Sequence, residues 1–222
     1  MNNTKKLMIV DGNSILNRAY YGIRLLTNSE GFYTNAIYGF LNILFKHIEE
    51  ENPQYICVAF DMKAPTFRHK EYEQYKAHRK KMPDELAAQI PITKQILEAM
   101  NIAIFQREGY EADDIIGTVS RKCEESNVEC IIITGDKDSL QLASLTTKIK
   151  LITTSRGATK TEEYDEQKVF ERYGITPQQF IHVKGLMGDP SDNIPGVPGI
   201  GEKTALSLIK KYKSIENIYD NI

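Results

Sequence analysis

The sequence has 222 residues, of which 41% are hydrophobic, so it can bury the core of one domain and a small appended module. No stretch approaches the roughly 18 apolar residues of a membrane span, and the apolar run near the start is too short for a signal peptide. We therefore expect a cytoplasmic protein without a membrane partner. Three cysteines lacking a CxxC pair and four histidines lacking metal-binding spacing argue against a disulfide framework and a zinc site.

Short apolar runs alternate with helical patterns along the first three quarters of the chain. Five runs rich in β-branched residues predict buried strands of a mostly parallel sheet, at 7–10, 55–60, 102–105, 130–134 and 148–153. Apolar residues at a spacing of three to four predict helices between them, over 34–52, 83–100 and 111–127. The first should be capped by Thr34 or Asn35, and the second should open at Pro83 and be interrupted around Pro91. Such alternation predicts an open α/β sheet with helices on both faces.

From about Asp165 the pattern changes to short helices joined by tight turns, with a hairpin rich in proline and glycine, NIPGVPGIG, among them. We therefore expect an α/β core over residues 1–164, which includes a basic segment at about 66–82. A small all-helical module over 165–222 should follow it. Because the sequence stops soon after the hairpin, we expect this module to be truncated at its C-terminus.

Nine acidic residues fall in pairs and triplets, mostly where an apolar run ends or a helix should begin: Asp11, Asp61, Glu111, Asp113, Asp114, Asp136, Asp138, Asp189 and Asp192. Because strand ends share one edge of a parallel sheet, Asp11, Asp61 and Asp136 should reach one crevice. Clustered carboxylates repel one another unless cations lie between them, and hard ions such as Mg²⁺ prefer oxygen ligands. Two such ions suit in-line attack on a phosphodiester, so the pattern predicts a metal-dependent nuclease.

Each of these acids also has an ordinary structural explanation. A single aspartate after a strand is often a helix N-cap or a turn residue. The motif EADD at 111–114 would be stabilised by the N-terminus of the helix it opens, where its first and last acids share one face. The motif DKD at 136–138 places two acids on the same side of an extended segment. Helix caps explain one or two such acids, but they do not explain the whole set.

Basic residues gather in one segment, with seven between Lys63 and Lys81 against two acids. There Tyr72 and Tyr75 interleave with basic side chains, a pattern that suits single-stranded nucleic acid. The alternative is a solvated, charged helix. Just past Asp11, the cluster Arg18, Tyr20 and Tyr21 could approach a phosphate or stack on a base.

The segment GVPGIGEKTA is not a Walker A loop, because Glu202 separates its last glycine from the lysine and no strand precedes it. A helix, a glycine turn and a new helix predict a helix–hairpin–helix. Its glycines would expose backbone N–H groups to a phosphate, beside the N-terminus of the next helix. Contacts of this kind bind a duplex without reading its sequence. A plain turn between packed helices is the alternative.

Seven stretches resemble the 5′-nuclease (flap endonuclease-like) family, and within it the N-terminal 5′→3′ exonuclease domains of bacterial DNA polymerases I. They are VDGNSILNRAYYG, AIYGF, VAFDMKAPTFRH, YKAHRKKMPDEL, GYEADDIIGT, TGDKDSLQL and KGLMGDPSDNIPGVPGIGEKTA. These stretches run in the order of the family and cover nearly the whole chain, and the last is highly specific.

The resemblance implies a PIN-like core and a helix–hairpin–helix (H3TH) module in an enzyme that cuts 5′ ends and 5′ flaps of DNA during replication and repair. It implies two Mg²⁺ ions, which Mn²⁺ can replace, on all nine acids, and a K⁺ ion at the hairpin. The residues 66–82 match the family's arch, through which the 5′ strand passes. A polymerase domain in the same full-length chain and a monomeric state are also implied.

The same resemblance assigns roles to individual residues. The catalytic residues would be Asp11, Asp113, Asp136, Lys76, Arg79 and Arg18. The DNA-binding residues would be Arg18, Tyr20, Arg68, Tyr75, Lys76, Arg79, Lys80, Gly196, Gly199, Gly201, Lys203 and Thr204. Three alternatives remain: a stand-alone exonuclease, a non-catalytic duplex-binding module, and a phosphatase for small molecules.

Overall fold

The computed structural model describes residues 4–155 and 158–221. Its central sheet has the strand order β3-β2-β1-β4-β5-β6. The strands are β1 (Lys6–Asp11), β2 (Tyr55–Ala59), β3 (Ala103–Phe105), β4 (Glu129–Thr134), β5 (Thr147–Ser155) and β6 (Ala158–Tyr164). The first five are parallel, whereas β6 runs antiparallel to β5. The five predicted strands and the mostly parallel sheet are confirmed; β6 was not anticipated, because its sequence ATKTEEY contains no apolar run.

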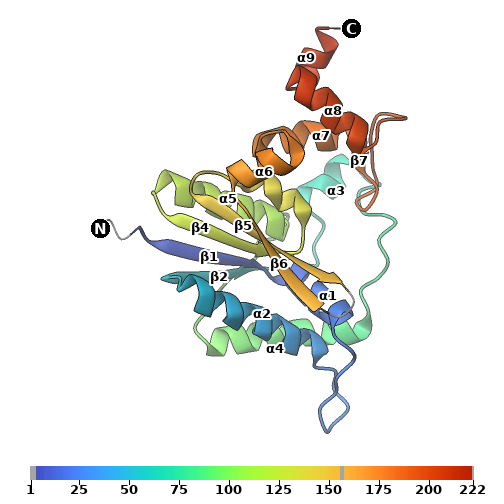
Figure 1. Cartoon of the computed structure of the whole chain (residues 1–222). Coiled ribbons are helices and arrows are strands. Elements are labelled where there is room, and N and C mark those ends of the chain that lie inside the picture. The colour runs from blue at the N-terminus through green and yellow to red at the C-terminus, as the bar shows by residue number, and fades with distance from the viewer. Residues whose placement is uncertain (1–3, 156–157, 222) are drawn as a thin grey trace.

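Helices cover both faces of this sheet, as expected (Figure 1). The helices of the core are α1 (Gly12–Gly22), α2 (Asn35–Glu51), α3 (Phe67–Glu71), α4 (Asp84–Ala99), α5 (Ala112–Glu125) and the 3-10 helix η1 (Lys137–Leu142). The three predicted helices are confirmed to within two residues at each end. No helix in the described ranges is long and apolar enough to cross a membrane.

Two apolar cores form because successive side chains of a strand point to opposite faces of the sheet. On β1, Met8 and Val10 pack with α1, α2 and α4 on one face. Ile9, between them in sequence, packs with α5 on the other face. This sandwich holds the ends of β1, β2 and β4 at fixed positions.

Helix α4 is continuous through Pro91, so the expected interruption there is wrong. A proline removes one backbone donor from a helix, which weakens it locally. Here Leu86 and Leu97, on either side of the proline, are buried in the first core. Their packing stabilises the helix against the loss of that single hydrogen bond. Thr34 occupies the N-cap position of α2, but its side chain makes no capping hydrogen bond.

The C-terminal part contains α6 (Glu166–Tyr173), η2 (Pro177–Gln179), α7 (Phe180–Met187), α8 (Glu202–Tyr212) and α9 (Ile215–Tyr219). It has a third core of its own, around Val183, Leu186 and Ile209. The module is not all-helical, since a short antiparallel pair joins β7 (Gly188–Asp189) to β8 (Ile194–Pro195). Helix α6, which we expected to begin this module, instead buries its Val169 in the second core of the sheet.

Two glycines permit the close crossing of β7 and β8. Gly188 has a φ of +70°, and a Cβ on Gly196 would lie 2.2 Å from the backbone carbon of Met187. Backbone atoms cannot yield as a flexible side chain can. We therefore expect Gly196→Ala to destabilise the module by about 1–3 kcal/mol, measured by urea unfolding. Gly201→Ala is the control, because its added methyl group meets nothing within 4 Å; equal destabilisation by both substitutions would contradict this expectation.

Candidate active site

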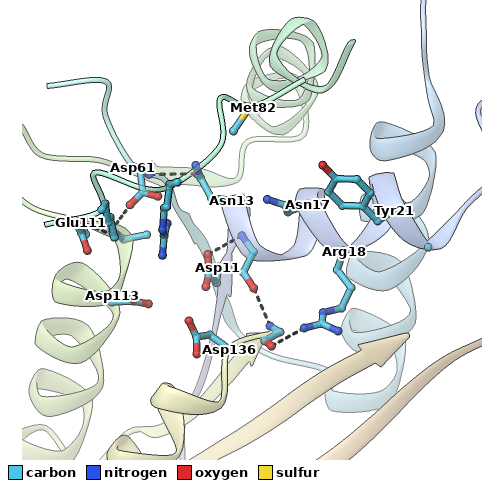
Figure 2. Close-up of a pocket in the computed structure, with 16 residues that line it drawn as sticks. Asp11, Asn13, Asn17, Arg18, Tyr21, Asp61, Met82, Glu111, Asp113 and Asp136 are labelled. Carbon is cyan, nitrogen blue, oxygen red and sulfur yellow. Dashed lines mark hydrogen bonds and ion pairs between the residues drawn. The ribbon is translucent and has the colours of Figure 1, made fainter. Parts of the chain in front are cut away.

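Three carboxylates lie at the ends of three adjacent strands. Asp11 ends β1, and Asp61 and Asp136 follow β2 and β4 by two residues each. Together with Glu111 and Asp113 at the start of α5, they line one cavity of about 710 Å³. Figure 2 shows these side chains around the cavity, with Asp113 and Asp136 facing each other across it. The expected convergence of the strand ends is therefore confirmed.

Asp11 is the most deeply placed of these acids, with 5% of its surface exposed. It caps α1 by accepting a hydrogen bond from the Ser14 N–H at 3.0 Å, and it accepts another from the Thr134 hydroxyl at 2.9 Å. Burial raises its pKa to about 6, with contributions from the charges of Asp61 and Asp136, and the two hydrogen bonds only partly oppose this shift.

Asp113 projects from the first turn of α5 into the same cavity. Loss of hydration in the cavity raises its pKa to about 8, and the negative charges of Asp11, Asp136, Asp61 and Glu111 act in the same direction. The side chain is nevertheless open to solvent along the cavity. Repulsion between neighbouring carboxylates therefore acts in this cavity at neutral pH, and a bound cation would relieve it.

This repulsion predicts how the stability of the metal-free chain depends on pH. The folded-state pKa values of Asp11 and Asp113 are about 6 and about 8, above the ordinary 3.8. Between about pH 4 and pH 8 the folded chain holds protons that the unfolded chain has released, so stability falls as pH rises. For the buried Asp11, about two pKa units correspond to about 3 kcal/mol. Thermal unfolding in chelator should show the melting temperature falling from pH 5 to pH 8, less steeply in Asp113→Asn. A melting temperature that rises over this range would contradict the expectation.

Asp61 and Asp136 both cap a helix and line the cavity, so the two explanations of these acids are compatible. Asp61 accepts a hydrogen bond from the Ala112 N–H at 2.7 Å, which caps α5. Asp136 accepts one from the Asp138 N–H at 2.9 Å, which caps η1. Capping fixes one oxygen of each carboxylate and directs the side chain toward the cavity. The helix termini thus place the acids that line it.

A second cavity of about 780 Å³ adjoins the first and shares Glu111 and Asp113 with it. The remaining acids line it: Asp114, Asp138, Asp189 and Asp192. The nine acids thus line two neighbouring cavities. Asp136 and Asp138 also face different cavities, because the chain enters a 3-10 helix at this point instead of staying extended.

Side-chain cations already pair with the acids of the second cavity. Both terminal nitrogens of Arg68 donate to Asp114, each at 2.8 Å. Lys184 lies 2.8 Å from Asp138 and 3.0 Å from Asp189. For Asp189, burial acts to raise the pKa, but Ser191 and Lys184 outweigh it and leave the pKa lowered. Lys184 was not predicted as a site residue, although it lies five residues before Asp189 on α7.

The donor chemistry of both cavities fits hard divalent cations, since all the candidate ligands are carboxylate oxygens. Within residues 4–155 and 158–221, however, no three acidic, histidine or cysteine side chains are placed so as to hold one ion. Most of the carboxylates are instead hydrogen-bonded to helix termini or paired with lysine and arginine. Ion binding would therefore require some side chains to turn away from these partners.

The basic side chains differ in where the structure places them. Arg18, Lys76 and Arg79 line the first cavity, and Arg18 is held there by donating to the carbonyl of Gly135 at 2.7 Å. Tyr20 is partly buried against the first core and does not line the cavity, whereas the exposed Tyr21 does. Lys80 is exposed and lines neither cavity.

Tyr75 was expected to offer a platform for a base, yet only 5% of its surface is exposed. Residues 66–82 form one short helix, α3, followed by turns, because the segment folds back onto α5 and the 189–193 loop. This packing buries the Tyr75 ring, which is therefore not available to stack on a base. The segment is therefore a short, mostly exposed helix followed by turns, and not one continuous solvated helix.

The predicted hairpin connects α7 to α8 through exposed residues. Gly199 has a φ of +82°, which favours glycine, and Gly201 is the N-cap of α8. Lys203 and Thr204 lie exposed in the first turn of that helix, and Gly196 lies at the base of the hairpin. This arrangement has the order of a helix–hairpin–helix.

Several polar residues at the first cavity escaped the sequence analysis. Asn13 accepts a hydrogen bond from the Asp61 N–H at 3.2 Å, and Ser14 accepts one from the Gly135 N–H at 3.0 Å. Thr134 donates to Asp11 and accepts from the Asp136 N–H at 3.0 Å. Small hydroxyl and amide residues beside a strand end were the available signal, but such residues are common in turns.

The sequence matches two family models, one after the other. Residues 6–174 match the N-terminal resolvase-like domain of the 5′-3′ exonucleases, and residues 175–222 match the C-terminal SAM fold of the 5′-3′ exonucleases. Among curated proteins, DNA polymerase I of Bacillus subtilis (strain 168) is 48% identical over 222 residues, which is 100% of this chain and 25% of that protein. The chain thus spans about a quarter of the length of the curated relatives it matches.

Solved structures show the same fold at lower identity. The bacteriophage T5 5′-exonuclease with bound divalent metal ions (zinc) has a TM-score of 0.76 at 24% identity, covering 98% of this chain and 79% of that one. Flap endonuclease-1 from Methanococcus jannaschii has a TM-score of 0.58 at 20% identity, covering 98% and 76%. The two family models match consecutive parts of the sequence, and the strand-end carboxylates line one cavity. The chain belongs to the 5′-3′ exonuclease family.

Proposed function

We propose that this chain hydrolyses DNA phosphodiester bonds at 5′ ends and 5′ flaps, as a divalent-metal-dependent nuclease. One observation carries the proposal: acids from β1, β2, β4 and α5 line one cavity that Arg18, Lys76 and Arg79 also line. Carboxylates suit metal ions and basic side chains suit a phosphate, so a cavity with both fits phosphoryl chemistry.

Two Mg²⁺ ions, replaceable by Mn²⁺, are our proposed cofactors. Asp11, Asp61, Asp113 and Asp136 would hold one ion in the first cavity. Asp138 and Asp189 would chiefly hold the other, with Glu111 between the cavities and Asp114 and Asp192 nearby. When bound, such ions would supply a water of lowered pKa and neutralise charge on the phosphate.

The chain's own residues would position the substrate. Arg18, fixed by its hydrogen bond to Gly135, can pair with a phosphate oxygen at the cavity wall. Lys76 and Arg79, on the 66–82 segment, line the same cavity. Positive charge from the three side chains would stabilise the charge that develops on the phosphate and favour a 5′-phosphate and a 3′-hydroxyl as products.

We propose that two further segments handle the DNA strands. The 66–82 segment, hereafter the arch, would guide the 5′ strand. The hairpin from Gly196 to Gly201 would bind the duplex through backbone N–H groups, with Lys203, Thr204 and a K⁺ ion assisting. We also propose two functional units, divided near residue 164, in a monomeric, cytoplasmic protein. Its full-length form would carry a polymerase domain, as the relatives' names suggest.

The test uses a duplex with a fluorescent 5′ flap, titrated with Mg²⁺. We expect cleavage near the flap junction that chelation abolishes and that Mg²⁺ or Mn²⁺ restores. A closed circular duplex, which has no 5′ end, and a free nucleoside monophosphate serve as control substrates. Binding of the flap without cleavage at any metal concentration would favour a DNA-binding module, and hydrolysis of the monophosphate would favour a phosphatase. Either outcome would overturn the proposal.

A further inference from the structure

The arch packs against the acidic loop of residues 189–193, and each of the two segments donates hydrogen bonds to the other. The Lys76 N–H donates to the Asp192 carbonyl at 2.9 Å, and Asn193 donates to the Gln74 carbonyl at 2.8 Å. Arg79 donates to the Asp192 carboxylate at 2.5 Å. These segments lie more than 100 residues apart in sequence, so only tertiary structure brings them together.

Asp192 is the centre of this contact. Its carboxylate accepts hydrogen bonds from Tyr75 and Arg79, lies 3.9 Å from the Lys76 ammonium, and its carbonyl accepts from the Lys76 backbone. The other acid of the loop, Asp189, makes no hydrogen bond or ion pair with the described arch residues and pairs with Lys184 and Ser191 instead. The arch therefore recognises Asp192 alone of the two.

Tyr75 extends the contact to Glu111, which lies between the two cavities. Its hydroxyl lies 3.1 Å from Asp192 and 3.0 Å from Glu111, and the ring stacks edge-on against His69. Lys76 donates to Glu111 at 2.7 Å from the next position. Glu111 is buried and lines both cavities. A single buried hydroxyl thus lies within hydrogen-bond distance of the acidic loop and of an acid at the boundary between the cavities, and its one proton can be donated to either carboxylate.

We propose that Asp192 and Tyr75 form a latch that holds the arch on the C-terminal module. In this role both are positioning residues: Asp192 fixes the arch, and Tyr75 carries that restraint to Glu111. Asp192, which the sequence suggested as a metal ligand, is occupied by the arch. The inference rests on the proposed nuclease function for its purpose but not for its test.

The latch has a consequence for substrate binding. Asp192 is followed within two residues by β8, which leads into the hairpin proposed to bind duplex. A duplex on the hairpin would therefore fix the loop to which the arch is latched. Arch closure over the cavity and duplex binding would become one linked event, because both use the 189–193 loop.

The test measures hydrogen exchange of peptides covering residues 72–82, with chelator and without DNA. Asp192→Asn should speed exchange there about tenfold, the ratio expected for a lost charge-assisted hydrogen bond. Tyr75→Phe should act in the same direction, since it removes only the hydroxyl. Asp84→Asn is the matched control, because it breaks the exposed Lys81–Asp84 pair beside the arch; peptides from β4 should be unchanged in all variants.

If Asp192→Asn loosens α8 as well, then Arg79→Gln and Tyr75→Phe decide, because they change only the arch side. Unchanged arch exchange in all three variants would overturn the latch. So would a loss of Mn²⁺ affinity by calorimetry in Asp192→Asn with normal arch exchange, which would make Asp192 a metal ligand. No measurement here requires cleavage, so the latch and the nuclease proposal fail separately.

Discussion

Replacing Asp113 with asparagine is expected to lower turnover on a 5′-flap substrate by at least about a hundredfold, the loss typical when a ligand for charge stabilisation is removed. Asp113 faces the acids of β1 and β4 across the first cavity, and among the described residues its carboxylate accepts no hydrogen bond. The substitution therefore removes charge without removing a structural contact. Single-turnover cleavage at saturating DNA would measure the effect.

Binding must be measured beside turnover, because the two outcomes separate catalysis from recognition. In Asp113→Asn the affinity for flap DNA should stay near that of the unmodified chain, since the substitution removes no structural contact. The variant should also be more stable than the unmodified chain at pH 8 without metal. Parallel losses of affinity and turnover would instead place Asp113 in DNA binding.

Replacing Lys76 with alanine should slow cleavage about tenfold to a hundredfold and reduce the slope of log affinity against log salt by about one. Its ammonium lines the cavity and pairs with Glu111 at 2.7 Å, so it can exchange this partner for a phosphate. Salt-dependent binding and single-turnover cleavage together measure both effects.

Lys81→Ala is the matched control for Lys76→Ala. Lys81 lies on the same segment, but its ion pair with Asp84 is fully outside the cavity and highly exposed. Its loss should leave the cleavage rate unchanged. An unchanged salt slope in Lys76→Ala would show that this ammonium makes no phosphate contact, and its effect on cleavage would then come from Glu111.

The first cavity could be predicted because its acids follow strong local signals. Runs such as LMIV and CIIIT form strands by apolar content alone, and the strand ends of a parallel sheet share one edge. Asp11, Asp61 and Asp136 could therefore be placed together without coordinates. The same logic fails for β6, whose sequence ATKTEEY contains no apolar run.

The pairing of charges could not be predicted, because it depends on contacts between distant segments. Arg68 could have faced solvent or DNA, yet it makes a bidentate contact with Asp114. Lys184 bridges two acids that lie 51 residues apart, at 138 and 189. The sequence predicted an exposed Tyr75 ring that could stack on a base, but the fold buries this ring. The partner of a long side chain depends on the tertiary fold, and local sequence periodicity does not indicate it.

The order in which the cavity is completed has a consequence for protein synthesis. Its walls come from residues 11, 61, 111–113 and 136, and β4, which delivers the last of them, pairs directly with β1. A nascent chain that has emerged from the ribosome only as far as α5 lacks both β4 and the last carboxylate. Such a chain is expected to leave DNA uncut, so the capacity for damage would arise only once most of the sheet has been made.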